Sequence, residues 1–434
     1  MNIIRWSVPI LSLALLVQPA HAQESKRSGF GILADSSLSG YDDRGGMGGP
    51  TNIDAQLELD NQASEAYFRV PIRVFQSWFA KKKEINEKYG IRYGLNYTAV
   101  YLTASEGVTD SSQTNAAGGI IDIPVSWLLV GKESGNTGTL AFKFENRHNY
   151  SSTKVPPMFL GFETGSMLLP ATKVNEFTFR FPELYWQQVL FASKLHFVVG
   201  KVDPTNYYTF HGLIHPFMNF FGYGASVSAS ANWPNQGFGL IASVLPTPKK
   251  NFYVLAGLHD AGGDPFKDGQ VLYWGENFFD GKFFKAVEVG YVPTFEERYF
   301  KKVSITYWHS DEYTGSAEGD GIAFASHWFF QEKWVPFLLA GFSDGNGANT
   351  LAKSIVSTGI GRRFKSHDLV GLNLNWLRPP GTGMRDQYTA ELYYRFYLTE
   401  HLELTPDLQY VKDPSLNPGV SSLWYFGLRG RITL

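Results

Sequence analysis

The sequence predicts an all-β fold, a transmembrane antiparallel β-barrel of about 16 strands, with about 18 as the alternative and a short N-terminal helix. Three observations predict it: an export signal at the start, alternation of polar and apolar residues from Ile91 onward, and a final strand that is apolar on one face. We expect a signal peptide at 1–22, a flexible segment at 23–66, an amphipathic helix at 67–90 and the barrel at 91–434.

The final strand shows the alternation most clearly. Its apolar side chains share one face because successive side chains in a strand point to opposite sides; they are Trp424, Phe426, Leu428, Ile432 and Leu434. Arg429 and Arg431 lie on the other face. An exposed apolar strand invites aggregation in a soluble protein. In a barrel that face meets lipid, and the last strand pairs with the first.

The first residues have the pattern of a secretory signal peptide. Arg5 precedes an apolar run at 8–17, and Ala20-His21-Ala22 forms a small-residue cleavage site before Gln23. The run is about 10 residues, whereas a bilayer requires roughly 20. The sequence therefore predicts export, cleavage after Ala22 and a place in the outer membrane of a Gram-negative bacterium.

Composition excludes several classes of function. There are no cysteines, so disulfides and thiolate chemistry are excluded. The net charge is only −2 and there is no basic block, which argues against a nucleic-acid partner. Aromatic residues make up 16% of the chain, which is typical of a barrel whose strands alternate between lipid and water.

One segment has a helical pattern before the strands begin. After Pro71, apolar residues recur near the helical period up to Ile85, lysines 81–83 occupy the other face, and Gly90 ends the segment. From Ile91 onward the period is two, which predicts about seventeen strands. One of them is expected at 222–233 and the last at 422–434. A bacterial single-chain barrel needs an even number of strands. Either two of the predicted strands are therefore one strand, or one of them is two.

If the apolar face meets lipid, the opposite face lines the lumen. A charge facing lipid at mid-depth costs about 2–4 kcal/mol for Arg or Lys, so the alternation itself places the charges inside. A lumen of mixed charge selects small ions weakly, but the guanidinium fork of Arg suits hydroxyl groups. Inward aromatic rings would stack on sugar rings or simply fill the wall. The candidate pore-lining residues are Arg92, Lys143, Glu145, Arg147, Arg180, Glu288, Trp308, Tyr393 and Arg395.

Several segments resemble the carbohydrate-selective porins of the OprB type. They are WFAKKKEINEKYGIRYGLNYTAVY (78–101), ELYWQQ (183–188), GKVDP (200–204), NFYVLAGLHDAGGDP (251–265) and, most specifically, residues 390–419 with the closing strand. The resemblance spans roughly residues 70–434. It implies a barrel of about 16 strands that admits monosaccharides and similar small solutes by diffusion. Region 206–221 departs from it by being unusually aromatic.

The sequence contains no familiar catalytic or nucleotide-binding motif, so we predict neither an enzyme nor catalytic residues. His211 and His215 stand four apart outside any evident helix, which favours exposed loop histidines over a metal site. Two glycine-containing acidic turns, at 260–265 and 344–349, have oxygen ligands for Ca²⁺ but are more simply turns. We expect no cofactor, with Ca²⁺ in a loop as the alternative.

The leading hypothesis is an outer-membrane porin for passive diffusion of carbohydrates. Its partners would be small carbohydrate solutes and outer-membrane lipid, and the barrel would be a monomer or a trimer. Two alternatives remain open at this point. One is a general or organic-solute porin on the same barrel, and the other is a closed barrel that acts as a structural or binding protein.

Overall fold

The structure of the chain is a computed structural model that describes residues 46–60, 67–68, 73–132, 134–264, 270–331, 333–364 and 368–434. The expected signal peptide, its cleavage site and residues 23–45 lie outside the described residues. The expected flexible segment is described at 46–60, where the structure differs from the expectation. Residues 46–59 are buried, and helix α2 (Ile53–Asp60) lies in this stretch.

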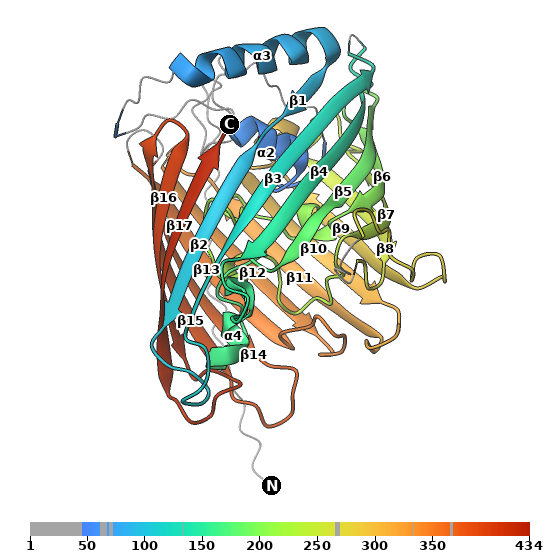
Figure 1. Cartoon of the computed structure of the whole chain (residues 1–434). Helices are drawn as coiled ribbons and strands as arrows, with labels where there is room; N and C mark the ends of the chain where they lie inside the picture. The colour runs from blue at the N-terminus through green and yellow to red at the C-terminus, as the bar shows by residue number, and fades with distance from the viewer. Residues whose placement is uncertain are drawn as a thin grey trace.

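Strands β2 to β17 form one closed antiparallel barrel (Figure 1). Each strand pairs with its neighbours in the chain, and β17 pairs with β2 to close the sheet. β1 is an extra strand that pairs with β3. The predicted fold class is therefore confirmed, with 16 strands in the closed barrel and one more beside it. The strands are β1 (Ile91–Tyr93), β2 (Asn96–Ala104), β3 (Asn115–Val130), β4 (Gly138–Asn149), β5 (Phe177–Leu190), β6 (Leu195–Val202), β7 (Gly237–Val244), β8 (Phe252–Asp260), β9 (Phe283–Tyr291), β10 (Lys301–Ser310), β11 (Gly319–Trp328), β12 (Trp334–Ser343), β13 (Ser354–Arg363), β14 (Leu369–Arg378), β15 (Gln387–Thr399), β16 (Leu402–Lys412) and β17 (Ser422–Thr433).

The two faces of each strand differ as the alternation predicts. On β17, Phe426 is 54% exposed on the outside of the barrel, whereas Arg429 and Arg431 are each 1% exposed and point inward. Outward apolar side chains also follow β9 and β10, for example Val289 and Ile305. The outer wall is thus a continuous apolar surface of the kind that faces lipid.

Connections are short at one end of the barrel and long at the other (Figure 1). Short turns include 191–194 and 400–401, and long loops include 150–176 and 261–282. We call these ends the short-turn end and the long-loop end. Short helical pieces occur in the long loops, among them α4 (Leu160–Thr164).

Helix α3 (Arg73–Tyr89) lies across the short-turn end, within the range where a helix is expected (Figure 1). Its Phe79 stacks on His401 with ring centroids 4.6 Å apart. Gly90, with φ of 69°, follows it in the left-handed conformation that favours glycine after a helix. Lys82, expected on the face opposite the apolar residues, is buried. Its amino group lies 5.4 Å from the centroid of the Phe79 ring and donates to the Leu434 carbonyl at 3.1 Å. None of the helices that the structure describes is long and apolar enough to cross a membrane.

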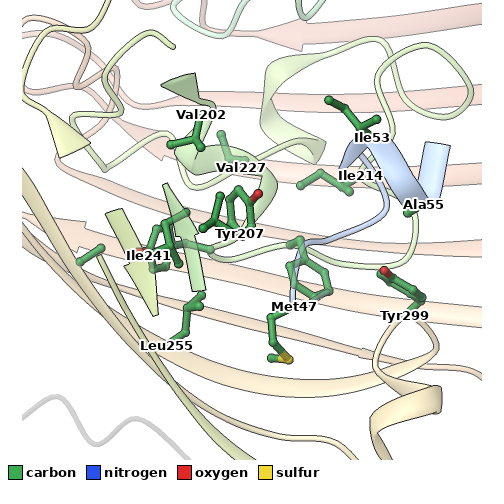
Figure 2. Close-up of a cluster of buried hydrophobic side chains, with 14 of the residues drawn as sticks. Met47, Ile53, Ala55, Val202, Tyr207, Ile214, Val227, Ile241, Leu255 and Tyr299 are labelled. Atoms are coloured by element: carbon green, nitrogen blue, oxygen red, sulfur yellow. The ribbon is translucent and has the colours of Figure 1, made fainter. Parts of the chain in front are cut away.

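Two stretches of chain lie inside the barrel. We call residues 46–60 the inner segment and residues 203–236, between β6 and β7, the inner loop. Figure 2 shows Met47, Ile53 and Ala55 of the inner segment beside Ile214 of the inner loop. They belong to one hydrophobic cluster with wall residues of β6 to β10, so the barrel is not an empty tube.

The strand expected at 222–233 is wrong. This stretch belongs to the inner loop and folds as turns, with a short 3₁₀ helix at Tyr223–Ala225. Its backbone bonds are local, for example Ser226 N–H to the Tyr223 carbonyl at 2.9 Å. The alternating Gly, Ala and Ser residues here reflect close packing inside the barrel, because small side chains are needed on every side of a buried loop.

Candidate functional site

Two sectors of the inner wall differ in their side chains. The charged sector is the inner face of β1 to β5 and β15 to β17, which are contiguous because β17 pairs with β2. Its charged side chains are all buried within the barrel; they are Arg92, Asp122, Lys143, Glu145, Arg147, Arg180, Glu183, Glu391, Arg395, Glu403, Asp407, Arg429 and Arg431. The apolar sector is the inner face of β6 to β12, which is mostly apolar but includes the buried ion pair of Glu288 with Lys302. Its buried side chains include Val198, Ile241, Leu255, Phe284, Trp308, Phe337 and Leu339.

Three candidate residues share the inner face of β4 at every second position. Arg147 forms an ion pair with Glu145, at 2.6 Å from Nη2, and its Nη1 donates to Asn175 at 2.7 Å. Lys143 lies 3.4 Å from Glu183 on β5. This part of the wall therefore presents donors and acceptors in alternation, with both signs of charge paired.

Arg180 is held at the wall by an acidic residue from a long loop. It forms an ion pair with Asp264, which also pairs with Lys201 at 2.8 Å. Two cations thus share one carboxylate, and the three side chains are all nearly inaccessible. They connect β5, β6 and the loop that follows β8.

Arg92 is bonded to the inner segment. It forms an ion pair with Asp54 of α2, and Ser126 donates to the same carboxylate at 2.5 Å. Arg431, on β17, forms a second ion pair with Asp60 at 2.6 Å. The inner segment is therefore held to the charged sector at both ends of α2.

Arg395 and Arg429 hold the inner loop across the lumen. Arg429 donates to the carbonyls of Pro216 and Asn219, at 2.8 Å each. Arg395 donates to the Asn219 side chain at 3.2 Å. Glu391 accepts the backbone N–H of Phe221 at 2.5 Å. These charges satisfy backbone groups that would otherwise be buried without partners.

The remaining candidates pack against other side chains. Trp308 is fully buried and stacks on Phe284 with ring centroids 6.0 Å apart. Tyr393 meets Phe220 of the inner loop edge to face, with centroids at 4.8 Å. Both rings point inward, as their phase indicates, but they are covered by side chains and not by open lumen.

Glu288 anchors the inner loop. It forms an ion pair with Lys302 at 2.9 Å and accepts the Tyr253 hydroxyl at 2.6 Å. Its other oxygen accepts Thr306 Oγ1 and the backbone N–H of Thr209, both at 2.7 Å. All the candidate pore-lining residues therefore lie on the inner face, and their contact with a solute stays a prediction.

The expected exposed histidines are buried, which corrects the sequence-based interpretation. His211 stacks on Phe337 with centroids 4.2 Å apart, and its Nε2 lies 2.8 Å from the Ala225 carbonyl. His215 is 2% exposed in the same loop. The residues that the structure describes include no group of three His, Asp or Glu arranged to hold a metal.

The carboxylates of the two acidic turns accept hydrogen bonds from nearby backbone N–H groups. Asp260 accepts the backbone N–H groups of Gly263 at 2.7 Å and Phe278 at 2.8 Å. Asp344 accepts the N–H of Asn346 at 2.9 Å. Carboxylates that accept N–H groups in this way close turns, and the expectation of no cofactor stays a prediction.

A small pocket opens at the short-turn end beside α2. Its lining residues are Leu59, Asp60, Met218, Tyr397, Glu400, His401, Glu403, Arg431 and Thr433. Both carboxylate oxygens of Glu403 are buried, and within the described part of the chain no group donates a hydrogen bond to them. The inner segment, the inner loop and the charged sector meet here.

Comparison with known proteins agrees with this geometry. Residues 337–434 match the carbohydrate-selective porin, OprB family. This match confirms the resemblance predicted from the sequence. It covers β13 to β17 and part of β12, which supply Tyr393 and Arg395 among the candidates. No curated protein matches the whole chain or a part of it.

The two structures of Pseudomonas putida OprB are similar to this barrel in fold. The high-pH structure of Pseudomonas putida OprB is similar with a TM-score of 0.66 and 14% identity, covering 86% of this chain and 99% of that one. Its low-pH structure matches with a TM-score of 0.50 and 16% identity over 86% of this chain and 100% of that one. A mutant of Rh. blastica porin matches with a TM-score of 0.49 and 9% identity over 79% and 100%.

Sequence reasoning missed the residues that bring the inner segment into the barrel. Asp54 and Asp60 lie six apart on a helix that is short and weakly amphipathic, so no period reveals them. The signal that was available is the aromatic region at 206–221, which falls in the inner loop. Its apolar side chains are needed to fill the lumen against the apolar sector.

Proposed function

We propose that the protein is an outer-membrane porin through which carbohydrates, such as monosaccharides, diffuse passively along the charged sector. The observation that carries this proposal is the alternation of paired Lys, Glu and Arg on β4, together with the family match over 337–434. Paired charges leave little net field to select ions, while their donors and acceptors suit hydroxyl groups. The family and the fold indicate a channel, not an enzyme.

The apolar outer wall supports a place in the outer membrane, with lipid as the surrounding partner. Phe426, Ile305 and Val289 are each more than half exposed on that wall. Burying such a surface in lipid is favourable by roughly 25 cal/mol per Å² of apolar area. We infer that the short-turn end faces the periplasm, because barrels of this kind have short periplasmic turns.

Swelling of proteoliposomes tests the proposal. Purified, refolded protein is compared in glucose and in an uncharged non-sugar solute of equal size. We expect faster swelling in glucose, because the charged sector bonds hydroxyl groups. Equal swelling would favour a general or organic-solute porin.

The closed barrel remains a second candidate because the inner segment and the inner loop fill much of the lumen. The closed-barrel hypothesis predicts no swelling of the proteoliposomes in either solute. A matched sample of heat-denatured protein in the same vesicles gives the background rate.

A further inference from the structure

The inner segment occupies the lumen but is not part of the barrel sheet. Every residue from 46 to 59 is buried, and Ile53 and Leu57 have no exposed surface. The barrel closes through β17 and β2 without it. An isolated helix shorter than about 12 residues is marginal in water. The fold of α2 therefore depends on contacts with its surroundings.

The polar side of the inner segment bonds to the charged sector. Asp54 pairs with Arg92, and Asp60 pairs with Arg431 at 2.6 Å. Gln56 donates to Asp122 on β3. Each of these bonds is made by side chains, and each partner on the wall is a charged group that water or a solute hydroxyl can satisfy in its place.

The other side of the inner segment packs on the inner loop. The Gly49 N–H donates to the Asn206 carbonyl at 2.6 Å, and Asn52 donates to the Tyr207 hydroxyl at 3.2 Å. Met47 and Ile53 join the apolar cluster there (Figure 2). The segment thus fills the space between the inner loop and the charged sector, which is the space that a solute would use.

We propose that the inner segment is an internal plug that closes the charged sector in the resting protein and withdraws when the channel opens. The sheet hydrogen bonds stay intact when it leaves. On the wall of the charged sector it uncovers charge: Arg92, Asp122 and Arg431 become lumen-facing groups for solute hydroxyls. Its apolar contacts with the inner loop, such as that of Ile53, oppose withdrawal. Only this last step rests on the proposed function, because closure itself concerns any solute, including ions.

A reversible cross-link tests the plug. The chain has no cysteine, so D54C/S126C introduces the only thiol pair, at two side chains that are hydrogen-bonded in the closed state. Conductance is measured in planar bilayers in KCl. We expect low conductance when the pair is oxidised and a several-fold rise on reduction, since the Asp54–Arg92 pair is also lost. S126C alone, which cannot close an intramolecular bridge, should not respond to the oxidant.

A second variant removes the ion pairs without a cross-link. D54N/D60N should conduct several-fold more than the natural protein, whereas the matched control D110N, at an exposed loop position, should not differ from it. Heat-modifiable gel mobility first verifies that each barrel is folded. Should D54N/D60N not fold, the reduced and oxidised forms of D54C/S126C still decide the question.

Three results would overturn the plug. They are equal conductance of the oxidised and reduced pair, equal conductance of D54N/D60N and the natural protein, and no current in any folded variant. A rise in KCl conductance without glucose preference in swelling would support the plug and reject the carbohydrate function. The two proposals therefore fail in different measurements.

Discussion

The charged and apolar sectors are both inner faces of one pleated sheet, yet they contact the chain inside the barrel through different interactions. Against the apolar sector the inner loop packs through rings and aliphatic groups, as Trp233 on Phe284 and His211 on Phe337 show. Against the charged sector the interior chain is held by ion pairs, such as Asp60 with Arg431. The apolar sector is mainly a hydrophobic core that includes the Glu288–Lys302 ion pair, whereas the charged sector contacts the interior chain mostly through polar bonds.

The difference has an energetic consequence. Burial of apolar area stabilises by roughly 25 cal/mol per Å², and nothing in water replaces it. A buried ion pair roughly breaks even against its desolvation, and its charges are well satisfied when water returns. The apolar sector therefore adds to the polar bonds that fix the inner loop in place. The bonds between the charged sector and the inner segment can be replaced by water or a solute, while the apolar contacts of Met47 and Ile53 oppose release.

The largest expected effect on stability comes from removing a large side chain from the apolar sector. Trp308→Ala should lower the free energy of unfolding by about 3–5 kcal/mol, because it leaves a large cavity under Phe284. The midpoint of urea unfolding, followed by gel mobility, measures it. Trp424→Ala is the matched control, since Trp424 is 41% exposed on the outer wall, and it should lose much less. Equal losses would show that the inner side chain is no better packed than the outer one.

A change in the charged sector should act on transport and leave folding intact. Arg147→Ala removes a lumen-facing cation while Lys143 stays on the same face of β4, so we expect altered conductance or solute preference with normal membrane assembly. Bilayer conductance and swelling measure this, with Arg378→Ala, 57% exposed at its side chain, as the control. Failed assembly together with unaltered purified channels would mean that Arg147 is structural.

The sequence predicted what depends on the pleat and missed what depends on contacts inside the barrel. Alternation placed Arg92, Glu288 and Arg395 on the inner face, because lipid excludes charge on the other face whatever the loops do. It could not show that Asp54 pairs with Arg92, since these residues come from separate elements and no spacing encodes the contact. The strand predicted at 222–233 was wrong because small residues alternate there to allow close packing and not to form a sheet.

The smallest expected effect is a pH dependence of the docking of α3, which lies across the short-turn end and not on either sector. Burial lowers the pKa of Lys82 to about 8, against a smaller opposing effect of Asp60. Detached α3 therefore binds more protons than docked α3 between about pH 8 and about 10.5, so docking should strengthen as pH rises through that window. Below about pH 8 Lys82 is protonated in both docked and detached α3, so the cost of burying its charge no longer changes with pH.

Hydrogen-exchange protection of α3, corrected for intrinsic rates, measures this at about pH 7 and about pH 10. Lys82→Met should remove the dependence, whereas Lys83→Met should keep it, because Lys83 is 59% exposed at its side chain. A pH dependence that survives Lys82→Met would assign it to another group.

The most direct test of the whole account is glucose entry into proteoliposomes that carry D54C/S126C, measured before and after reduction of the cross-link. We predict little entry while the inner segment is tied to β3, and faster entry for glucose than for an uncharged non-sugar of equal size once it is released. Equal glucose entry in both states would contradict a pathway along the charged sector that the inner segment closes.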